Sequence, residues 1–238
     1  MRRPNIVVLC QAHSSSTIVT AMYTKMGWLF ENPEDFKNRY EHFRLTIIKK
    51  AFKINGYDDE VKKMMDHHDL GSQAMRNCFQ RIRRDRGGEA MRKLFRRFLK
   101  GLNQPWIMKD PSFSFQCMPY FQDIFDEFGL NPMLVHLHKD LKLVMNSHDR
   151  EGHPKSQDEF IRYEKYIQKC YDYWKGPKRR ICIDDIKDSI RAKDKEGFLK
   201  AMAIWDIEVS DDQVESAWEM FDLNRDNPGH PLQGTGKY

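Results

Sequence analysis

A cluster of hydroxyl side chains near the N-terminus has the setting of an anion-binding turn. Ser14–Thr17 follow an apolar stretch, Ile6–Cys10, and precede a segment of helical apolar periodicity, Ile18–Met26, that ends at Gly27. This order predicts a strand, a polar turn and a helix with glycine at its C-terminal end. The first amides of a helix have no partner within it and the helix dipole adds positive charge, so a phosphate is stabilised there. An ordinary serine-rich helix N-cap is the alternative, and the turn alone does not decide between the two.

Two later segments place cations at the ends of predicted strands. Lys109 lies in "WIMKDP" (106–111), and Lys139 directly follows "MLVHLH" (133–138). Ligands of open parallel sheets lie beyond the carboxyl ends of the strands, so a lysine there can stabilise charge on a transferring group. Ser147 comes two helical turns after Lys139, and both can reach one phosphate if the segment curls around it.

Four segments, in this order, resemble the sulfotransferases that use 3'-phosphoadenosine 5'-phosphosulfate. "HSSST" (13–17) is similar to the family's R-S-G-T-[ST], and "IMKDP" to its hydrophobic-hydrophobic-K-[DST]-P. "KDLKLVMNS" (139–147) is similar to R-D-P-x-x-[VA]-x-x-S, and "ICIDDI" (181–186) to [VI]-x-[YF]-E-D-L. His13 and Lys139 stand where the family usually has Arg, Ser15 where it has Gly, and Leu141 where it has Pro. The four segments touch roughly a third of the chain, and residues 33–100 carry no resemblance.

The resemblance implies an enzyme that moves a sulfuryl group from this donor to the hydroxyl of a glycan or small molecule, by in-line displacement and without a metal. Its donor-binding positions correspond to His13, Ser14, Ser15, Ser16, Thr17, Lys139 and Ser147, with Arg150 close by. Lys109 would stabilise the leaving group, with His13 as a possible second contributor. Asp184 and Asp185 would have a structural role at the start of a helix.

The transfer also needs a group that takes the proton of the acceptor hydroxyl. Relatives carry a glutamate soon after the first helix, which indicates Glu31 or Glu34 here. His67 or His68 in "DHHD" (66–69) is the alternative, because histidine titrates near neutral pH. Adjacent residues seldom converge on one ion, so this cluster is interpreted as a solvated turn rather than a metal site.

The elements that must position these residues read as a three-layer α/β/α domain with a central parallel sheet. Helical patterns separate four apolar stretches, which is typical of parallel sheets covered on both faces. The four predicted strands are Ile6–Cys10, Trp106–Lys109, Met133–His138 and Arg180–Asp184.

A single domain, 1–238, is expected to carry a helical insertion at 33–104 on its acceptor side. That interval is too long for a simple crossover between strands. Apolar periodicity predicts one helix over 91–102, with Arg92 among its exposed cations, and another over 156–174. The tail 224–238 is rich in Gly and Pro and is expected to be loop.

The composition is that of a globular protein with a mild positive charge. The sequence has 238 residues, 40% of them hydrophobic, and a net charge of +5. No apolar run approaches the roughly 20 residues of a membrane span, and the basic N-terminus is not persuasive as a signal peptide. Five widely spaced cysteines without a C-x-x-C pair indicate neither disulfides nor zinc, so a reducing, cytoplasmic location is expected.

Three other functions remain open from the sequence. A basic helix at 76–100, with ten basic and two acidic residues, could bind nucleic acid. It could equally be a solvated helix face, or a funnel that attracts an anionic donor or a sulfated glycan. A nucleotide kinase is less favoured, because the turn lacks the glycines and lysine of G-x-x-x-x-G-K-[ST]. A catalytically inactive relative is the third alternative, in view of His13 and Ser15.

Overall fold

Four strands form one parallel sheet in the computed structural model, which describes residues 3–11, 15–30, 43–110, 117–150 and 156–221. The sheet order is β2-β1-β3-β4, and every neighbouring pair is parallel. The strands are β1 (Ile6–Leu9), β2 (Ile107–Lys109), β3 (Met133–His138) and β4 (Lys178–Cys182).

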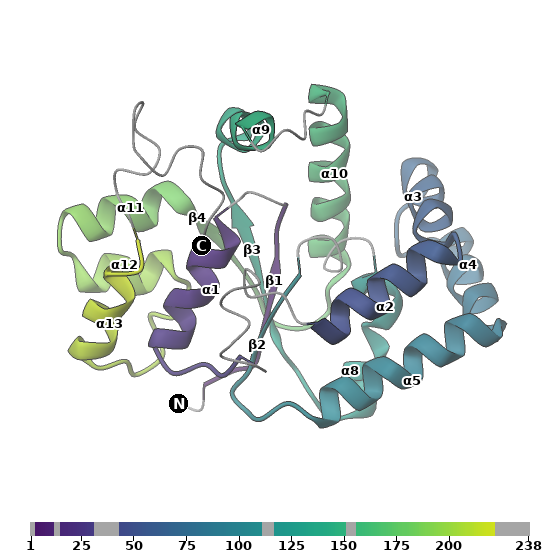
Figure 1. Ribbon diagram of the computed structural model, residues 1–238, viewed down its shortest axis with the longest axis horizontal. Helices are drawn as coiled ribbons and strands as arrows, with labels where there is room; N and C mark the ends of the chain where they lie inside the picture. Colours follow the sequence, from purple (N-terminus) through teal and green to yellow (C-terminus); the bar gives the residue numbers. More distant parts are fainter. Residues whose placement is uncertain (1–2, 12–14, 31–42, 111–116, 151–155, 222–238) are drawn as a thin grey trace.

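Helices cover both faces of the sheet, so the expected three-layer α/β/α architecture is confirmed (Figure 1). Because side chains alternate along a strand, Ile6 and Val8 of β1 enter one core and Val7 and Leu9 the other. The first core is closed by α1 (Ser16–Lys25), α11 (Ile183–Arg191), α12 (Lys195–Ala201) and α13 (Asp211–Trp218).

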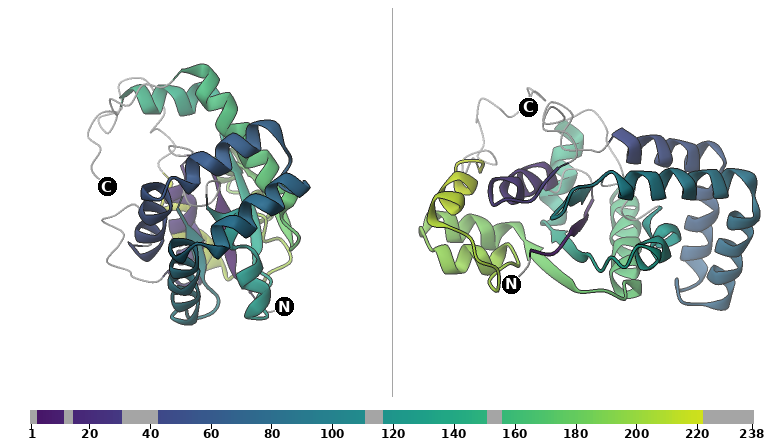
Figure 2. Two further views of the ribbon diagram at one scale, coloured as in Figure 1. Left: turned by 90° about the vertical axis from the view of Figure 1, so that its right-hand side faces the viewer. Right: turned by 90° about the horizontal axis from the view of Figure 1, so that it is seen from below.

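The second face carries the expected helical insertion. Its helices are α2 (Phe43–Ile54), α3 (Tyr57–His67), α4 (Gln73–Arg84) and α5 (Arg86–Lys100). The same core includes α7 (Met118–Phe121), α8 (Asp123–Glu127) and α10 (Gln157–Tyr173), while α9 (Leu141–Arg150) lies at the carboxyl edge of the sheet (Figure 1). The view from below separates the two helical layers clearly (Figure 2). Residues 33–42 of the predicted insertion lie outside the described residues.

The basic stretch 76–100 is two helices, so the expectation of one basic helix is wrong. Asp85 ends α4 and begins α5, where its carboxylate accepts a hydrogen bond from the amide of Gly87. A Cβ at Gly88 would lie 1.9 Å from the carbonyl oxygen of Ile82, so this tight corner requires glycine. Leu102 lies beyond the end of α5.

The predicted bounds of α1 and α10 agree closely with the structure, but the last strand was predicted two residues too late in the chain. Ser156 caps α10 in a reciprocal capping box with Glu159, which is the arrangement typical of a serine followed three residues later by a glutamate at a helix N-terminus. Gly27 follows α1 with a φ of 100°, which confirms its place after the helix end. The strand expected at Arg180–Asp184 ends at Cys182, and Cys182 rather than Asp184 or Asp185 is the N-cap of α11. Both acids lie in the first turn of that helix.

No helix in the described part of the chain is both long and apolar enough to cross a bilayer.

Candidate functional site

Four of the candidate residues, Ser15, Thr17, Lys109 and Lys139, lie at the carboxyl edge of the sheet, where β1 and β3 are neighbours. After β1 the chain enters α1 on one face of the sheet, whereas after β3 it proceeds to α10 on the other face. Connections that diverge from adjacent parallel strands mark the position at which open α/β sheets bind ligands. The first residue before α1, Ser15, and the residue after β3, Lys139, are joined by a hydrogen bond at this edge, and α1 and β3 can be followed in Figure 1.

Ser15 holds an unusual backbone conformation at the start of α1. It is the N-cap residue, with φ 64° and ψ 18°, and its side chain makes no capping hydrogen bond. The left-handed region costs a residue with a Cβ about 1 kcal/mol or more, and such strain is concentrated at functional sites. Glycine occupies this position in the sulfotransferase pattern, and the positive φ explains why a glycine would suit it.

Two lysines from neighbouring segments reach this turn. Lys109 Nζ, at the end of β2, donates to Thr17 Oγ1 over 3.3 Å, and Lys139 Nζ donates to Ser15 Oγ over 3.5 Å. Both lysines are buried, at 1% and 8% exposure. Two ammonium groups beside the positive end of a helix dipole concentrate positive charge at this turn, which suits a bound anion.

The remaining predicted donor contacts are only partly in reach of this cluster. Ser16 is buried in the first turn of α1. Ser147 is half-buried on α9, and no hydrogen bond within the described residues joins it to Lys139 or Ser15. His13 and Ser14 lie outside the described residues, as does the side chain of Arg150.

Of the predicted proton acceptors, Glu31 and Glu34 lie outside the described residues. His67 and His68 are exposed at the end of α3. Among the side chains that the structure describes, no group of His, Cys, Asp and Glu has the arrangement of a metal site.

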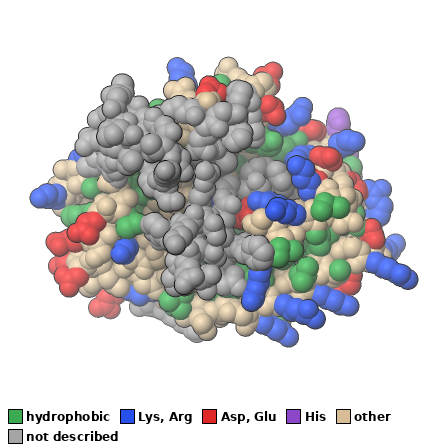
Figure 3. Space-filling view, viewed as in Figure 1, with side chains coloured by type: hydrophobic (Ala, Val, Ile, Leu, Met, Phe, Trp, Pro, Cys, Tyr) green, Lys and Arg blue, Asp and Glu red, His purple; other side chains and the backbone are tan. Residues whose placement is uncertain are grey.

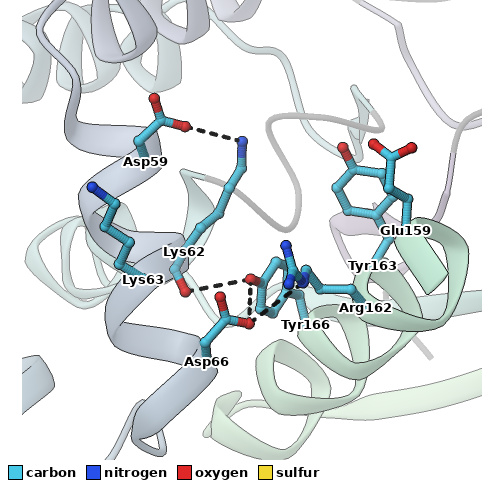
Figure 4. Close-up of a pocket in the computed structure, with 8 residues that line it drawn as sticks. All are labelled: Asp59, Lys62, Lys63, Asp66, Glu159, Arg162, Tyr163 and Tyr166. Atoms are coloured by element: carbon cyan, nitrogen blue, oxygen red, sulfur yellow. Dashed lines mark hydrogen bonds and ion pairs between the residues drawn. The ribbon is translucent and has the colours of Figure 1, made fainter. Parts of the chain in front are cut away.

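The DHHD segment borders a polar hollow between α3 and α10 (Figure 4). The hollow has a volume of about 320 Å³. Tyr166 Oη donates to Asp66 Oδ1 over 2.8 Å, and Arg162 Nε lies 3.7 Å from the same oxygen. Asp66 is therefore a link between two helices, which the interpretation as a solvated turn missed. The lining residues are Asp59, Lys62, Lys63, Asp66, Glu159, Arg162, Tyr163 and Tyr166.

Asp110, next to Lys109, anchors the insertion at the site. Its side chain is fully buried, and Lys49 Nζ of α2 lies 3.1 Å and 3.0 Å from its two carboxylate oxygens. Thr46 Oγ1, also on α2, donates to it over 3.5 Å. This contact fixes α2 at the end of β2, directly beside the lysine that reaches Thr17.

A second polar cluster at the same edge was not found from the sequence. Gln11, at the end of β1, donates through Nε2 to Glu164 Oε2 of α10 over 2.8 Å. His136 Nε2 and His138 Nδ1 of β3 lie 3.7 Å and 3.9 Å from Glu164 Oε1. Burial lowers the pKa of His136 to about 4, although Glu164 acts in the opposite direction. The sequence did contain one signal for this cluster, because two histidines occupy alternate positions of an otherwise apolar strand.

Several arginines of the basic stretch form ion pairs within the molecule. Arg92, expected on the surface, is buried and forms a bidentate contact with Asp123 of α8 at 3.0 Å and 2.8 Å. Arg96 pairs with Glu127 at 2.7 Å, and Arg83 with Asp123 at 3.1 Å. Leu94, expected in the buried stripe, is 39% exposed. Other Lys and Arg side chains remain visible along the edge formed by the insertion (Figure 3).

No protein-family model, no curated protein and no solved structure matches this chain.

Proposed function

We propose that this chain is a sulfotransferase that transfers the sulfuryl group of 3'-phosphoadenosine 5'-phosphosulfate to an acceptor hydroxyl. The observation that carries the proposal is the convergence of Lys109 and Lys139 on Thr17 and Ser15 at the N-terminus of α1. Two buried cations and the first turn of a helix suit a ligand with two separated phosphate groups.

In this function the 5'-phosphosulfate lies against Ser15, Ser16 and Thr17. Lys109 neutralises charge that develops on the leaving phosphate oxygen as the sulfur–oxygen bond breaks. Lys139 acts as a point charge for the 3'-phosphate, since lysine lacks the bidentate fork of arginine. The enzyme contributes mainly alignment and charge neutralisation, and both follow from groups held by the sheet edge.

The alternatives have less support. A nucleotide kinase of the P-loop type would need the glycines and lysine that the turn lacks. Nucleic-acid binding by 76–100 would draw on free cations, but Arg83, Arg92 and Arg96 are paired with carboxylates of α8. No observation specifically favours either alternative.

Calorimetric titration with adenosine 3',5'-bisphosphate, the product of the donor, tests the proposal. We expect micromolar binding that Lys139→Ala weakens about tenfold or more, the size of one charged hydrogen bond. Lys142→Ala is the matched control, because Lys142 is exposed on α9 only three residues away and should bind normally. AMP should bind more weakly for lack of the 3'-phosphate.

Absence of bisphosphate binding by the wild-type protein, or a preference for ATP with Mg²⁺, would overturn the sulfotransferase proposal. Equal losses in Lys139→Ala and Lys142→Ala would show that binding follows total charge rather than this site.

A further inference from the structure

We propose that Glu164 of α10 is the group that takes the proton from the acceptor hydroxyl, an inference that rests on the proposed sulfotransferase function. It assigns the role to a residue that the sequence patterns do not indicate. Glu31 and Glu34, the residues that the sequence favours, lie in a different part of the chain.

Glu164 lies beside both chain segments that carry the anion-binding groups. Its Oε2 accepts the hydrogen bond from Gln11, which precedes Ser15 by four residues. Its Oε1 lies 3.9 Å from Nδ1 of His138, the residue immediately before Lys139. A carboxylate on a separate helix thus borders the carboxyl ends of β1 and β3 together.

Glu164 approaches this edge from the face opposite to the donor-binding contacts. Gln11 contacts Phe160 and Glu164 of α10, on the face that also carries the insertion. Lys109 and Lys139 instead reach Thr17 and Ser15, at the start of the helix on the other face. In-line transfer requires the acceptor oxygen on the side of the sulfur opposite to the leaving oxygen. An acceptor that enters from the insertion side meets Glu164 in that position.

Glu164 has a neutral hydrogen-bond partner and is partly open to solvent. Gln11 supplies a neutral hydrogen-bond donor and no compensating charge. His136, 3.7 Å away, is neutral at physiological pH because burial lowers its pKa to about 4. Among the described residues, the other charged or titratable neighbours of this cluster include His138 of β3, Arg180 of β4, and Tyr171 and Asp172 of α10. The Glu164 side chain is 40% exposed, so the proton can pass on to solvent.

The step is balanced without any further reactant. The acceptor oxygen forms a bond to sulfur while the bond from sulfur to the phosphate oxygen breaks, and that electron pair leaves with adenosine 3',5'-bisphosphate. The hydroxyl proton moves to Glu164, and water then removes it from the carboxyl group. The carboxylate is regenerated for the next turnover.

Glu164→Gln tests the role while keeping the size of the side chain and an oxygen for Gln11. The readout is release of the bisphosphate from the phosphosulfate donor, with water and with p-nitrophenol as acceptors. We expect the rate with water to fall by about 10²- to 10⁴-fold, the usual contribution of a general base. Bisphosphate binding should be unchanged, and the acidic limb of the pH profile of kcat should disappear.

The acidity of the acceptor separates proton transfer from a structural role. p-Nitrophenol is largely ionised in mildly alkaline buffer and needs no base, so Glu164→Gln should react with it as fast as wild type. Sodium formate should restore part of the water reaction in Glu164→Ala, because a small carboxylate can occupy the vacated space. Asp172→Asn is the matched control, since it removes a carboxylate of the same helix that also influences His136 but should leave both rates unchanged.

The outcomes separate this inference from the function on which it rests. Wild-type protein that does not bind the bisphosphate, or binds it without consuming the donor, contradicts both. Normal binding with wild-type turnover in Glu164→Gln contradicts only the role of Glu164. Equal losses with water and with p-nitrophenol, without rescue by formate, would show a structural role and also overturn it.

Discussion

The dipeptide Lys109–Asp110 joins the two layers of the molecule at the residue scale. Successive side chains at a strand end point to opposite faces of a sheet. Lys109 accordingly contacts Thr17 of α1, while Asp110 contacts Lys49 of α2. Both side chains are buried, so a shift of either helix would expose one of these charges to solvent or separate it from its partner. The position of the catalytic lysine in the proposed function therefore depends on an ion pair with the insertion.

Lys49→Met should destabilise the protein because it removes a cationic partner of the fully buried Asp110. Breaking a buried pair on one side costs about 3 to 5 kcal/mol, and we expect about 3 kcal/mol because Lys49 is partly exposed. Urea unfolding followed by circular dichroism measures the change. Lys53→Met, an exposed position one turn further along α2, should have almost no effect. Similar losses in both variants would mean that helix charge, rather than the pair, is responsible.

His136 should make the protein less stable in mild acid. Its pKa is about 4 in the folded protein, below the value of about 6.5 for an unfolded chain. The unfolded state therefore binds the proton first, and stability is lost as the pH falls from about 6.5 towards 4. We expect the stability of His136→Gln relative to wild type to rise by about 2 kcal/mol between about pH 7.5 and pH 5, measured by urea unfolding. A difference independent of pH would contradict the buried neutral histidine.

At the scale of elements, local signals located the helices better than they located contacts between them. Ser156 and Glu159 define the start of α10 by themselves, because a capping box is made within one turn. Glu164 gave no such signal, since its importance comes from Gln11 and His136, which are distant in sequence. Arg92 was misplaced for the same reason, because the pattern of α5 does not contain its partner Asp123. The carboxyl ends of β1, β2 and β3 were predicted to within one residue and that of β4 was not, and no contact between neighbouring strand ends was predicted.

The tie between α3 and α10 can be tested with one hydroxyl group. Tyr166 Oη donates to Asp66 Oδ1 and lies 3.3 Å from the carbonyl oxygen of Lys62, and burial together with Asp66 raises the pKa of Tyr166. Tyr166→Phe should lower the free energy of unfolding by about 1 kcal/mol, the net value of such a hydrogen bond. Tyr171→Phe on the same helix is the control and should lower the free energy of unfolding less, because Tyr171 contacts Arg180 and His136 through its ring. Thermal unfolding of both variants gives the comparison.

At the scale of the whole molecule, the proposed function uses the two faces of one sheet differently, one for the donor and the other for the acceptor. The face with α1 and α11–α13 carries the proposed donor turn, and the face with α10 and the insertion α2–α5 carries Glu164 (Figure 1). The proposed donor site and the proposed acceptor side therefore meet along the carboxyl edge of the sheet. The four segments of the family resemblance concern the proposed donor side, and residues 33–100 offered no pattern to compare. The acceptor side could be described only once the tertiary contacts were known.

Occupation of the donor site should stabilise the whole fold, since the site joins β1, β2, β3 and α1. A ligand at 100 times its Kd adds about 2.7 kcal/mol to the free energy of unfolding. For a chain of this length, 1 kcal/mol corresponds to about 2 to 4 °C, so adenosine 3',5'-bisphosphate should raise the Tm by about 5 to 10 °C. Scanning calorimetry with this ligand at the same multiple of each variant's Kd should give equal shifts for wild type and Lys142→Ala. At one fixed ligand concentration, Lys139→Ala should show a smaller shift in Tm. Its higher Kd means that the ligand adds less to the free energy of unfolding. A shift of equal size with ATP and Mg²⁺ would instead indicate a general nucleotide site and argue against a donor with a 3'-phosphate.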